Sequence, residues 1–131
     1  MLTLSRSKIE ALERLSNGNH IIGALAIDQR GSLKKMIASH GNTSAGDEDI
    51  IKFKEIVSAE LTPFSTSILL DPEYGLPASR KRNEHAGLIL AYEKTGYDAS
   101  QPGRLPDLLD KWSVKRLKEQ GADAVKFLLY Y

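Results

Sequence analysis

The chain has 131 residues, enough for one domain with a hydrophobic core of its own. Its 18 Lys and Arg residues are balanced by 17 Asp and Glu residues, which argues against the basic surface that nucleic-acid phosphates require. Because the chain has no cysteine, a disulfide framework and a thiolate metal site are both excluded. The missing cysteine also fits a reducing cytoplasm.

Residues 1–8 are largely polar and lead into a helical pattern, so we expect no signal peptide. Every apolar run is far shorter than the roughly 20 residues of a membrane-spanning helix. We therefore expect a soluble, cytoplasmic protein that binds neither nucleic acid nor membrane.

Apolar runs alternate with helical patterns along the chain. In order, the patterns predict helix 7–15, strand 21–27, a short helix capped by Ser32, helix 47–61, strand 66–70, helix 76–80, strand 87–92, helix 108–120 and strand 125–131. None of the strand runs alternates between apolar and polar residues. Both faces of each strand should therefore be covered, as in a parallel sheet.

Two of the predicted helices carry clear boundary or packing signals. Helix 47–61 should end before Pro63, and helix 108–120 before Gly121. The spacing within helix 47–61 indicates a broad apolar stripe made by Ile50, Ile51, Phe53, Lys54, Ile56 and Val57.

A strand with its crossover helix takes about 30 residues, so the chain accommodates roughly four such units. A complete eight-unit barrel needs about 250 residues. We therefore predict an α/β fold in which residues 1–131 are the N-terminal portion of a single domain, the first half of a TIM (β/α)8 barrel that stops inside a strand. An open doubly wound sheet is the alternative, although residues 28–32 lack the glycine-rich turn that usually follows its first strand.

The active site of an α/β barrel lies at the carboxyl ends of its strands. Polar residues found there are Asp28, Gln29, Arg30, Asp71, Glu73, Glu93 and Lys94. Asp28 directly follows an apolar run, so its carboxylate should lie at the barrel mouth, where it could hold a sugar hydroxyl or orient a lysine. Alternatively, Asp28 forms an ion pair with Arg30 or caps the helix that begins near Ser32. The other charged residues could instead cap helices, contact solvent or pair with one another.

Lys126 lies inside a predicted strand, where a lysine is seldom found without a partner or a role. If Val125 and Phe127 face the helices, alternation points Lys126 into the barrel. A desolvated amine near other cations has a lowered pKa and can attack carbonyls, whereas an ammonium can stabilise an oxyanion or a phosphate. A purely structural ion pair is the third interpretation. The three histidines have no metal-ligand spacing, so we expect no metal site.

Four stretches, 26–31, 69–77, 91–97 and 121–131, resemble the bacterial tagatose 1,6-bisphosphate aldolases. The resemblance runs along the whole chain and includes all four predicted strand ends. It implies a TIM barrel and a class I, metal-independent lyase. That family cleaves D-tagatose 1,6-bisphosphate to dihydroxyacetone phosphate and glyceraldehyde 3-phosphate, in the tagatose 6-phosphate route of lactose and galactose breakdown.

The resemblance also implies roles for individual residues. Asp28 matches the active-site acid of the first strand, with Gln29 beside it, and Lys126 matches an assisting lysine rather than the Schiff-base lysine. The Schiff-base lysine, a catalytic glutamate and the phosphate-binding residues belong to later strands that this chain does not include. The segment alone should therefore be inactive.

Further expectations concern the ligand. Asp71 and Glu93 are candidates for substrate binding together with Gln29. The expected partner is a small sugar bisphosphate; no cofactor is expected, and a homo-oligomer is left open.

Two other functions stay open at this point. One is another phosphosugar barrel enzyme, such as an isomerase or epimerase. The other is a non-catalytic module that binds a partner through an unpaired strand edge at Tyr130 and Tyr131, because such edges attract other strands.

Overall fold

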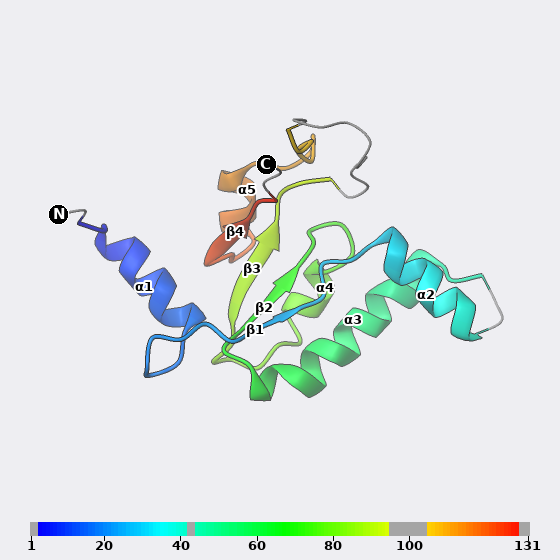
Figure 1. Cartoon of the computed structure of the whole chain (residues 1–131), viewed down its shortest axis with the longest axis horizontal. Coiled ribbons are helices and arrows are strands. Elements are labelled where there is room, and N and C mark those ends of the chain that lie inside the picture. The colour runs from blue at the N-terminus through cyan, green and yellow to red at the C-terminus, as the bar shows by residue number, and fades with distance from the viewer. Residues whose placement is uncertain (1–2, 42–43, 95–104, 129–131) are drawn as a thin grey trace.

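The computed structural model describes residues 3–41, 44–94 and 105–128. A sheet of four parallel strands forms its centre, in the spatial order β1-β2-β3-β4 (Figure 1). The strands are β1 (Ala24–Ala26), β2 (Ser67–Leu70), β3 (Gly87–Ala91) and β4 (Ala124–Lys126). Neighbours along the chain are thus neighbours in the sheet, which confirms the predicted parallel α/β fold and is the topology of successive barrel strands.

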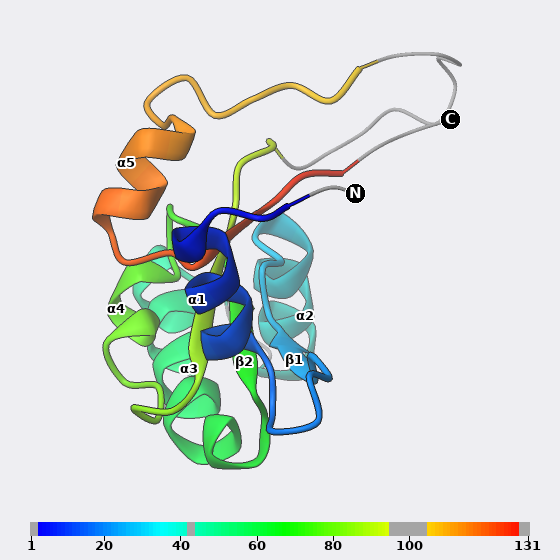
Figure 2. The ribbon, with the colours of Figure 1, turned by 90° about the vertical axis from the view of Figure 1, so that its left-hand side faces the viewer.

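The helices are α1 (Arg6–Leu15), α2 (Gly31–Gly41), α3 (Asp47–Leu61), α4 (Leu76–Ser79) and α5 (Val114–Glu119), with a 3-10 turn η1 (Thr62–Phe64) after α3. Figures 1 and 2 show α2 and α3 on one side of the sheet and α1 on the other. No helix in the described ranges combines the length and the apolar character that crossing a membrane requires.

One face of the sheet forms the hydrophobic core. Ile68, Leu70, Leu88 and Leu90 are fully buried there, and they pack with residues of the helices, including Leu33, Ile50, Ala78 and Leu117. Leu25 and Val125 share this face, since Leu25 lies opposite Ile68 and Val125 opposite Leu90. Side chains alternate along a strand, so Ala26, Leu69, Ile89 and Lys126 lie on the opposite face.

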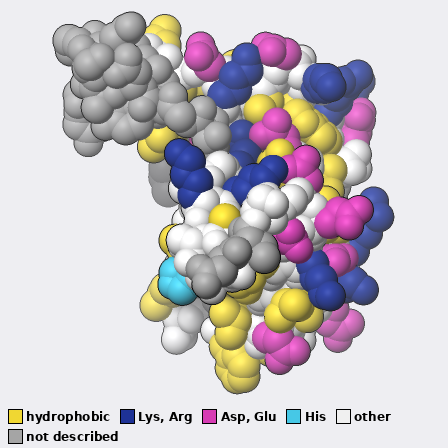
Figure 3. All heavy atoms as spheres, turned by 90° about the vertical axis from the view of Figure 1, so that its right-hand side faces the viewer, with side chains coloured by type: hydrophobic (Ala, Val, Ile, Leu, Met, Phe, Trp, Pro, Cys, Tyr) yellow, Lys and Arg dark blue, Asp and Glu magenta, His cyan; other side chains and the backbone are white. Residues whose placement is uncertain are grey.

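The opposite face is less covered. Leu69 and Ile89 are half-buried, and both Ala24 and Ala26 are exposed. The prediction that both faces of every strand are covered therefore fails for β1 within the described chain. The outer surface over α2 and α3 carries charges of both signs, interspersed with apolar side chains (Figure 3), in keeping with the balanced composition.

Helix α3 has the predicted bounds, and the chain leaves it for the 3-10 turn at Pro63. The predicted apolar stripe is too broad. The buried residues of α3 are Ile50, Lys54 and Ser58, whereas Phe53 and Ile56 are 40% and 53% exposed. The helix packs against α4 and α2 through this narrower face, and the Ser58 hydroxyl donates to the Ala78 carbonyl at 2.8 Å.

Three other local predictions need correction. Helix α2 begins at Gly31, so Ser32 lies inside the helix and does not cap it. Helix α5 covers only Val114–Glu119. Leu108, the predicted first residue, instead pairs with Glu93 in an antiparallel bridge. The Ser113 hydroxyl caps the helix by accepting from the Arg116 amide. Strand β4 ends at Lys126, and residues 129–131 of the predicted strand lie outside the described residues. Gly121 has φ +91°, as a helix-terminating glycine should.

The start of β3 lies directly against the end of α1, which leaves little room for a side chain at Gly87. A Cβ at Gly87 would lie 2.5 Å from the Arg14 carbonyl oxygen and 2.9 Å from the Leu15 side chain. We expect Gly87→Ala to lower the free energy of unfolding by about 1–3 kcal/mol through overpacking. Urea unfolding would measure this loss. Gly18→Ala is the matched control, because a Cβ at Gly18 meets nothing within 4 Å.

Candidate active site

The carboxyl ends of β1, β3 and β4 bring three charged side chains together. Lys126 is the last residue of β4 and lies opposite Ala91 in the sheet, while Asp28 and Glu93 each follow the end of their strand by two residues. The Lys126 ammonium donates to Asp28 Oδ2 at 3.0 Å and to Glu93 Oε1. We call Asp28, Glu93 and Lys126 the Lys126 cluster.

The cluster is partly shielded from solvent and lies on the face of the sheet opposite the helical core. The Lys126 side chain is 29% exposed, and that of Glu93 is 5% exposed. Burial lowers the pKa of Lys126, but its hydrogen bonds to Glu93 and Asp28 and the negative charge of both carboxylates together outweigh that effect, so the pKa lies above the ordinary 10.5. Lys126 is therefore an ammonium at neutral pH, which suits charge stabilisation better than attack on a carbonyl.

Glu93 has capacity for one more interaction. Its Oε2 atom is buried and has no hydrogen-bond partner among the residues that the structure describes. A buried carboxylate oxygen without a donor is costly. This atom is therefore a natural acceptor for a hydroxyl or ammonium group brought in by a ligand or by further polypeptide.

A second set of charged residues adjoins the Lys126 cluster, and Arg30 connects the two. Arg30 donates through Nη1 to Glu73 Oε2 at 2.8 Å and through Nη2 to the Glu93 carbonyl oxygen at 2.9 Å. Its Nε lies 3.7 Å from Asp71 Oδ2. The guanidinium thus joins the chain segments that follow β1, β2 and β3.

Lys54 and Asp71 complete this second group, and both are fully buried. Lys54 reaches from α3 to form an ion pair with Asp71, and it donates to the Ile27 carbonyl oxygen at 2.9 Å. Burial lowers the pKa of Lys54, although the adjacent Asp71 opposes the shift. We call Arg30, Lys54, Asp71 and Glu73 the buried charge network.

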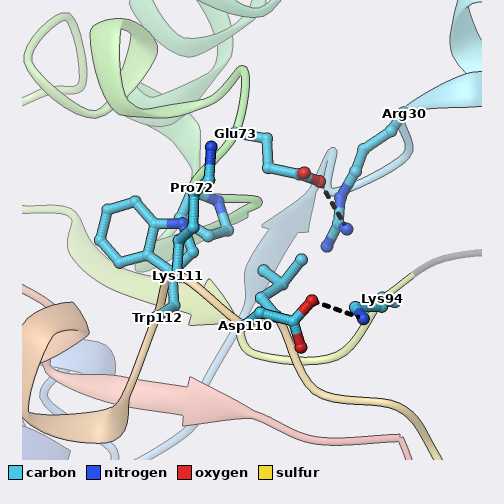
Figure 4. Close-up of a pocket in the computed structure, with 8 residues that line it drawn as sticks. Arg30, Pro72, Glu73, Lys94, Asp110, Lys111 and Trp112 are labelled. Carbon is cyan, nitrogen blue, oxygen red and sulfur yellow. Dashed lines mark hydrogen bonds and ion pairs between the residues drawn. The ribbon is translucent and has the colours of Figure 1, made fainter.

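A hollow of about 580 Å³, lined by both charged and apolar side chains, opens beside this network (Figure 4). Arg30 and Glu73 form one of its walls, and the ion pair between Lys94 and Asp110, 2.9 Å long, forms another. The remainder is lined by Pro72, Leu109, Lys111 and Trp112.

The structure brings some of the sequence candidates together and separates others. Asp28, Glu93 and Lys126 are in direct contact. Gln29 is exposed. Asp71 does not fit the expected role of a substrate ligand, because it is fully buried and its oxygens already accept from Lys54 and from the backbone amides of Glu73 and Tyr74.

Sequence reasoning missed the roles of Lys54 and Arg30. Arg30 was expected, if anything, to pair with Asp28, but Asp28 pairs with Lys126 and Arg30 with Glu73. The available signal for Lys54 was a lysine four residues after Ile50 and four before Ser58, on the buried side of α3. A charge at such a position needs a buried partner.

Parallel strands in sequential order, with charged residues gathered at their carboxyl ends, define this chain as part of an α/β barrel. A family model described as DeoC/LacD family aldolase matches residues 22–131, and the chain belongs to this family.

Curated relatives agree with the family match. Tagatose 1,6-diphosphate aldolase 2 of Enterococcus faecalis is 65% identical over 131 residues, which are 100% of this chain and 39% of that protein. Tagatose 1,6-diphosphate aldolase of Staphylococcus epidermidis is 61% identical over 130 residues, 99% of this chain and 40% of that protein. Tagatose 1,6-diphosphate aldolase 2 of Streptococcus pyogenes serotype M1 is 62% identical over 130 residues, 99% of this chain and 39% of that protein. The chain thus spans about two fifths of these relatives' length, and the resemblance seen in the sequence is confirmed.

Proposed function

We propose that the whole protein to which these residues belong is a class I aldolase. It reversibly cleaves D-tagatose 1,6-bisphosphate to dihydroxyacetone phosphate and glyceraldehyde 3-phosphate, through a Schiff base on a lysine outside residues 1–131. The observation that carries the proposal is the Lys126 cluster: an ammonium held by two carboxylates at the strand ends of a DeoC/LacD family chain.

The proposed reaction uses a neutral lysine amine, which adds to the C2 carbonyl of the ketose and loses water to give an iminium. A carboxylate then takes the proton from the C4 hydroxyl. The C3–C4 bond breaks, its electrons move into the iminium to form an enamine, and glyceraldehyde 3-phosphate leaves. Protonation at C3 and hydrolysis release dihydroxyacetone phosphate and restore the amine.

The described residues have supporting parts in this scheme. Asp28 orients the reacting lysine or the hydroxyl of the carbinolamine, and the Lys126 ammonium balances negative charge near them. Its raised pKa makes Lys126 a poor candidate for the nucleophile, which must lose its proton first. Glu93 Oε2, which lacks a donor among the described residues, is available to a sugar hydroxyl. Gln29 contributes to sugar binding from the exposed side.

The proposal includes no metal and no cofactor. The partner is a small sugar bisphosphate, which carries several negative charges and does not cross a bilayer freely. We therefore place the protein in the cytoplasm, where such substrates form. A homo-oligomer is compatible with this function.

Borohydride reduction in the presence of dihydroxyacetone phosphate tests the mechanism. We expect a stable adduct on the whole protein, located by peptide mass spectrometry on a lysine outside residues 1–131. An isomerase or epimerase would form no adduct. An adduct on Lys126 would make it the nucleophile and overturn its supporting role.

The 131-residue chain on its own should show no turnover of D-tagatose 1,6-bisphosphate, because the proposed nucleophile is not part of it. A coupled assay for dihydroxyacetone phosphate would measure this, with the whole protein as the positive control. Turnover by the 131-residue chain at a rate close to that of the whole protein would contradict the location of the Schiff-base lysine.

A further inference from the structure

We propose that Arg30 is a positioning residue that holds the Glu93 carboxylate against Lys126, and that the buried pair of Lys54 and Asp71 holds Arg30 and the end of β1 in place. This inference rests on the proposed aldolase function, and it assigns a purpose to four charged residues that the mechanism above does not use.

The cost of burying these charges is the first argument. Arg30, Lys54 and Asp71 are between 0% and 5% exposed. Taking each charge out of water costs several kcal/mol, and a buried ion pair is often no more stabilising than apolar residues of the same volume. A gain in stability therefore explains this network poorly. A role in holding the residues of the Lys126 cluster in position explains it well.

The end points of the network are the second argument. Its cations donate to two backbone carbonyls, and both belong to the segments that carry the partners of Lys126. Arg30 donates to the carbonyl of Glu93 itself, and Lys54 donates to the carbonyl of Ile27, which directly precedes Asp28. The network thus fixes the backbone from which each of the two carboxylates projects.

The shape of the guanidinium is the third argument. Arg30 bonds Glu73 with one terminal nitrogen and the Glu93 carbonyl with the other, so its planar fork spans the segments after β2 and β3. Lysine at this position would keep the charge but would lack the fixed fork. Asp71 lies beside the guanidinium and is itself fixed by Lys54 and by the backbone amides of Glu73 and Tyr74.

Loss of the Arg30 hydrogen bonds to Glu73 and to the Glu93 carbonyl has a specific electrostatic consequence. Among the described residues, Asp28 and Glu93 are the charged groups that face Lys126. Both raise the pKa of Lys126, and the hydrogen bond to Glu93 has a larger effect than the hydrogen bond to Asp28. Displacement of Glu93 should therefore lower the pKa of Lys126. The ammonium is then lost at a lower pH, and the alkaline limb of the pH–activity profile moves in the same direction.

The variant Arg30→Lys in the whole protein tests the inference. We expect kcat to fall about 10-fold with KM changed less than about 3-fold, and the alkaline limb of the kcat profile to move down by about 0.5–1 pH unit. A crystal structure of the variant should show the Glu93 carboxylate moved away from Lys126. The matched control is Lys34→Gln, which removes an exposed ion pair with Asp47 on the outer helices and should change none of these quantities.

Glu73→Gln is the second variant, for use if Arg30→Lys does not fold. Glu73 is 44% exposed, so this change is tolerated, and it weakens one arm of the Arg30 fork. We expect the same alkaline shift with a kcat loss of about 2- to 5-fold. An unmoved alkaline limb and unchanged kcat in every folded variant would overturn the inference.

The proposed function and this inference fail in different ways. A whole protein that shows neither a borohydride adduct nor cleavage of the sugar bisphosphate overturns the aldolase proposal. The position of Glu93 in the Arg30→Lys crystal structure does not depend on activity. If Glu93 stays against Lys126 in that structure, the positioning role is wrong even when the whole protein is an active aldolase.

Discussion

Replacing Lys126 by Ala in the whole protein should lower kcat by about 10²–10⁴-fold, because the change removes a preorganised positive charge from the reaction site. The ammonium donates to Asp28 and Glu93, so its loss also leaves two carboxylates facing each other without a cation between them. Steady-state cleavage of D-tagatose 1,6-bisphosphate measures the effect on kcat and KM separately.

The fold should survive this change. Lys126 lies on the less covered face of the sheet and its side chain is 29% exposed, so the hydrophobic core is untouched. Circular dichroism and the melting temperature should therefore stay close to those of the parent protein. Lys126→Arg is the matched control, since it keeps the positive charge, and it should recover part of the lost kcat. Kinetics unchanged in Lys126→Ala would return this lysine to a purely structural role.

The amino-acid sequence predicted the sheet well for a physical reason. Four short apolar runs without polar alternation are typical of parallel strands. The first three runs each contain one strand of the observed sheet, and the fourth overlaps β4 at Val125 and Lys126. Helix α3 was predicted with its observed bounds because apolar residues recur in it at helical spacing and Pro63 follows its end. These signals are local, and the tertiary structure does not override them.

The errors occur where distant residues decide the structure. Leu108 and Leu109 precede Trp112 by four and three residues, which is helical spacing. However, Leu108 pairs with Glu93 and the Leu109 amide donates to the Tyr92 carbonyl, which holds this segment against the end of β3. Helix propensity is a weak preference, and such contacts outweigh it. The stripe on α3 was too broad, because helical spacing does not reveal how wide a face the neighbouring helices cover.

The candidate site was predictable to a similar extent. The rule that barrel sites lie at strand ends singled out Asp28 and Glu93, and the unusual position of a lysine inside an apolar run singled out Lys126. The structure brings these three residues into contact. The same rule nominated Asp71, which lies at a strand end but is buried in an ion pair with Lys54. The position of Asp71 after its strand was predictable, whereas its ion-pair partner Lys54 lies on another element, 17 residues away in the sequence.

Removing the buried carboxylate of Asp71 should have the largest effect on stability. Asp71→Ala leaves the fully buried Lys54 without its ion-pair partner, and it removes the acceptor for the Glu73 and Tyr74 amides. An uncompensated buried charge typically costs about 3–5 kcal/mol, so we expect a loss of that size in the free energy of unfolding. Urea unfolding of the whole protein measures the loss. Glu10→Ala is the matched control, because it breaks an exposed ion pair with Arg6 and should cost less than about 1 kcal/mol.

The double variant Lys54→Met with Asp71→Asn separates the cost of an unpaired charge from the value of the pair. Both charges are then absent, Met fills a volume similar to that of Lys, and the Asn oxygen still accepts from the Glu73 and Tyr74 amides. We expect this variant to regain most of the stability lost in Asp71→Ala, because burying neither charge is about as favourable as burying the pair. Its kcat should nevertheless stay well below that of the parent protein, since Arg30 and the Ile27 carbonyl have lost the groups that fix them. A double variant with parental stability and parental kcat would show that the buried pair positions nothing.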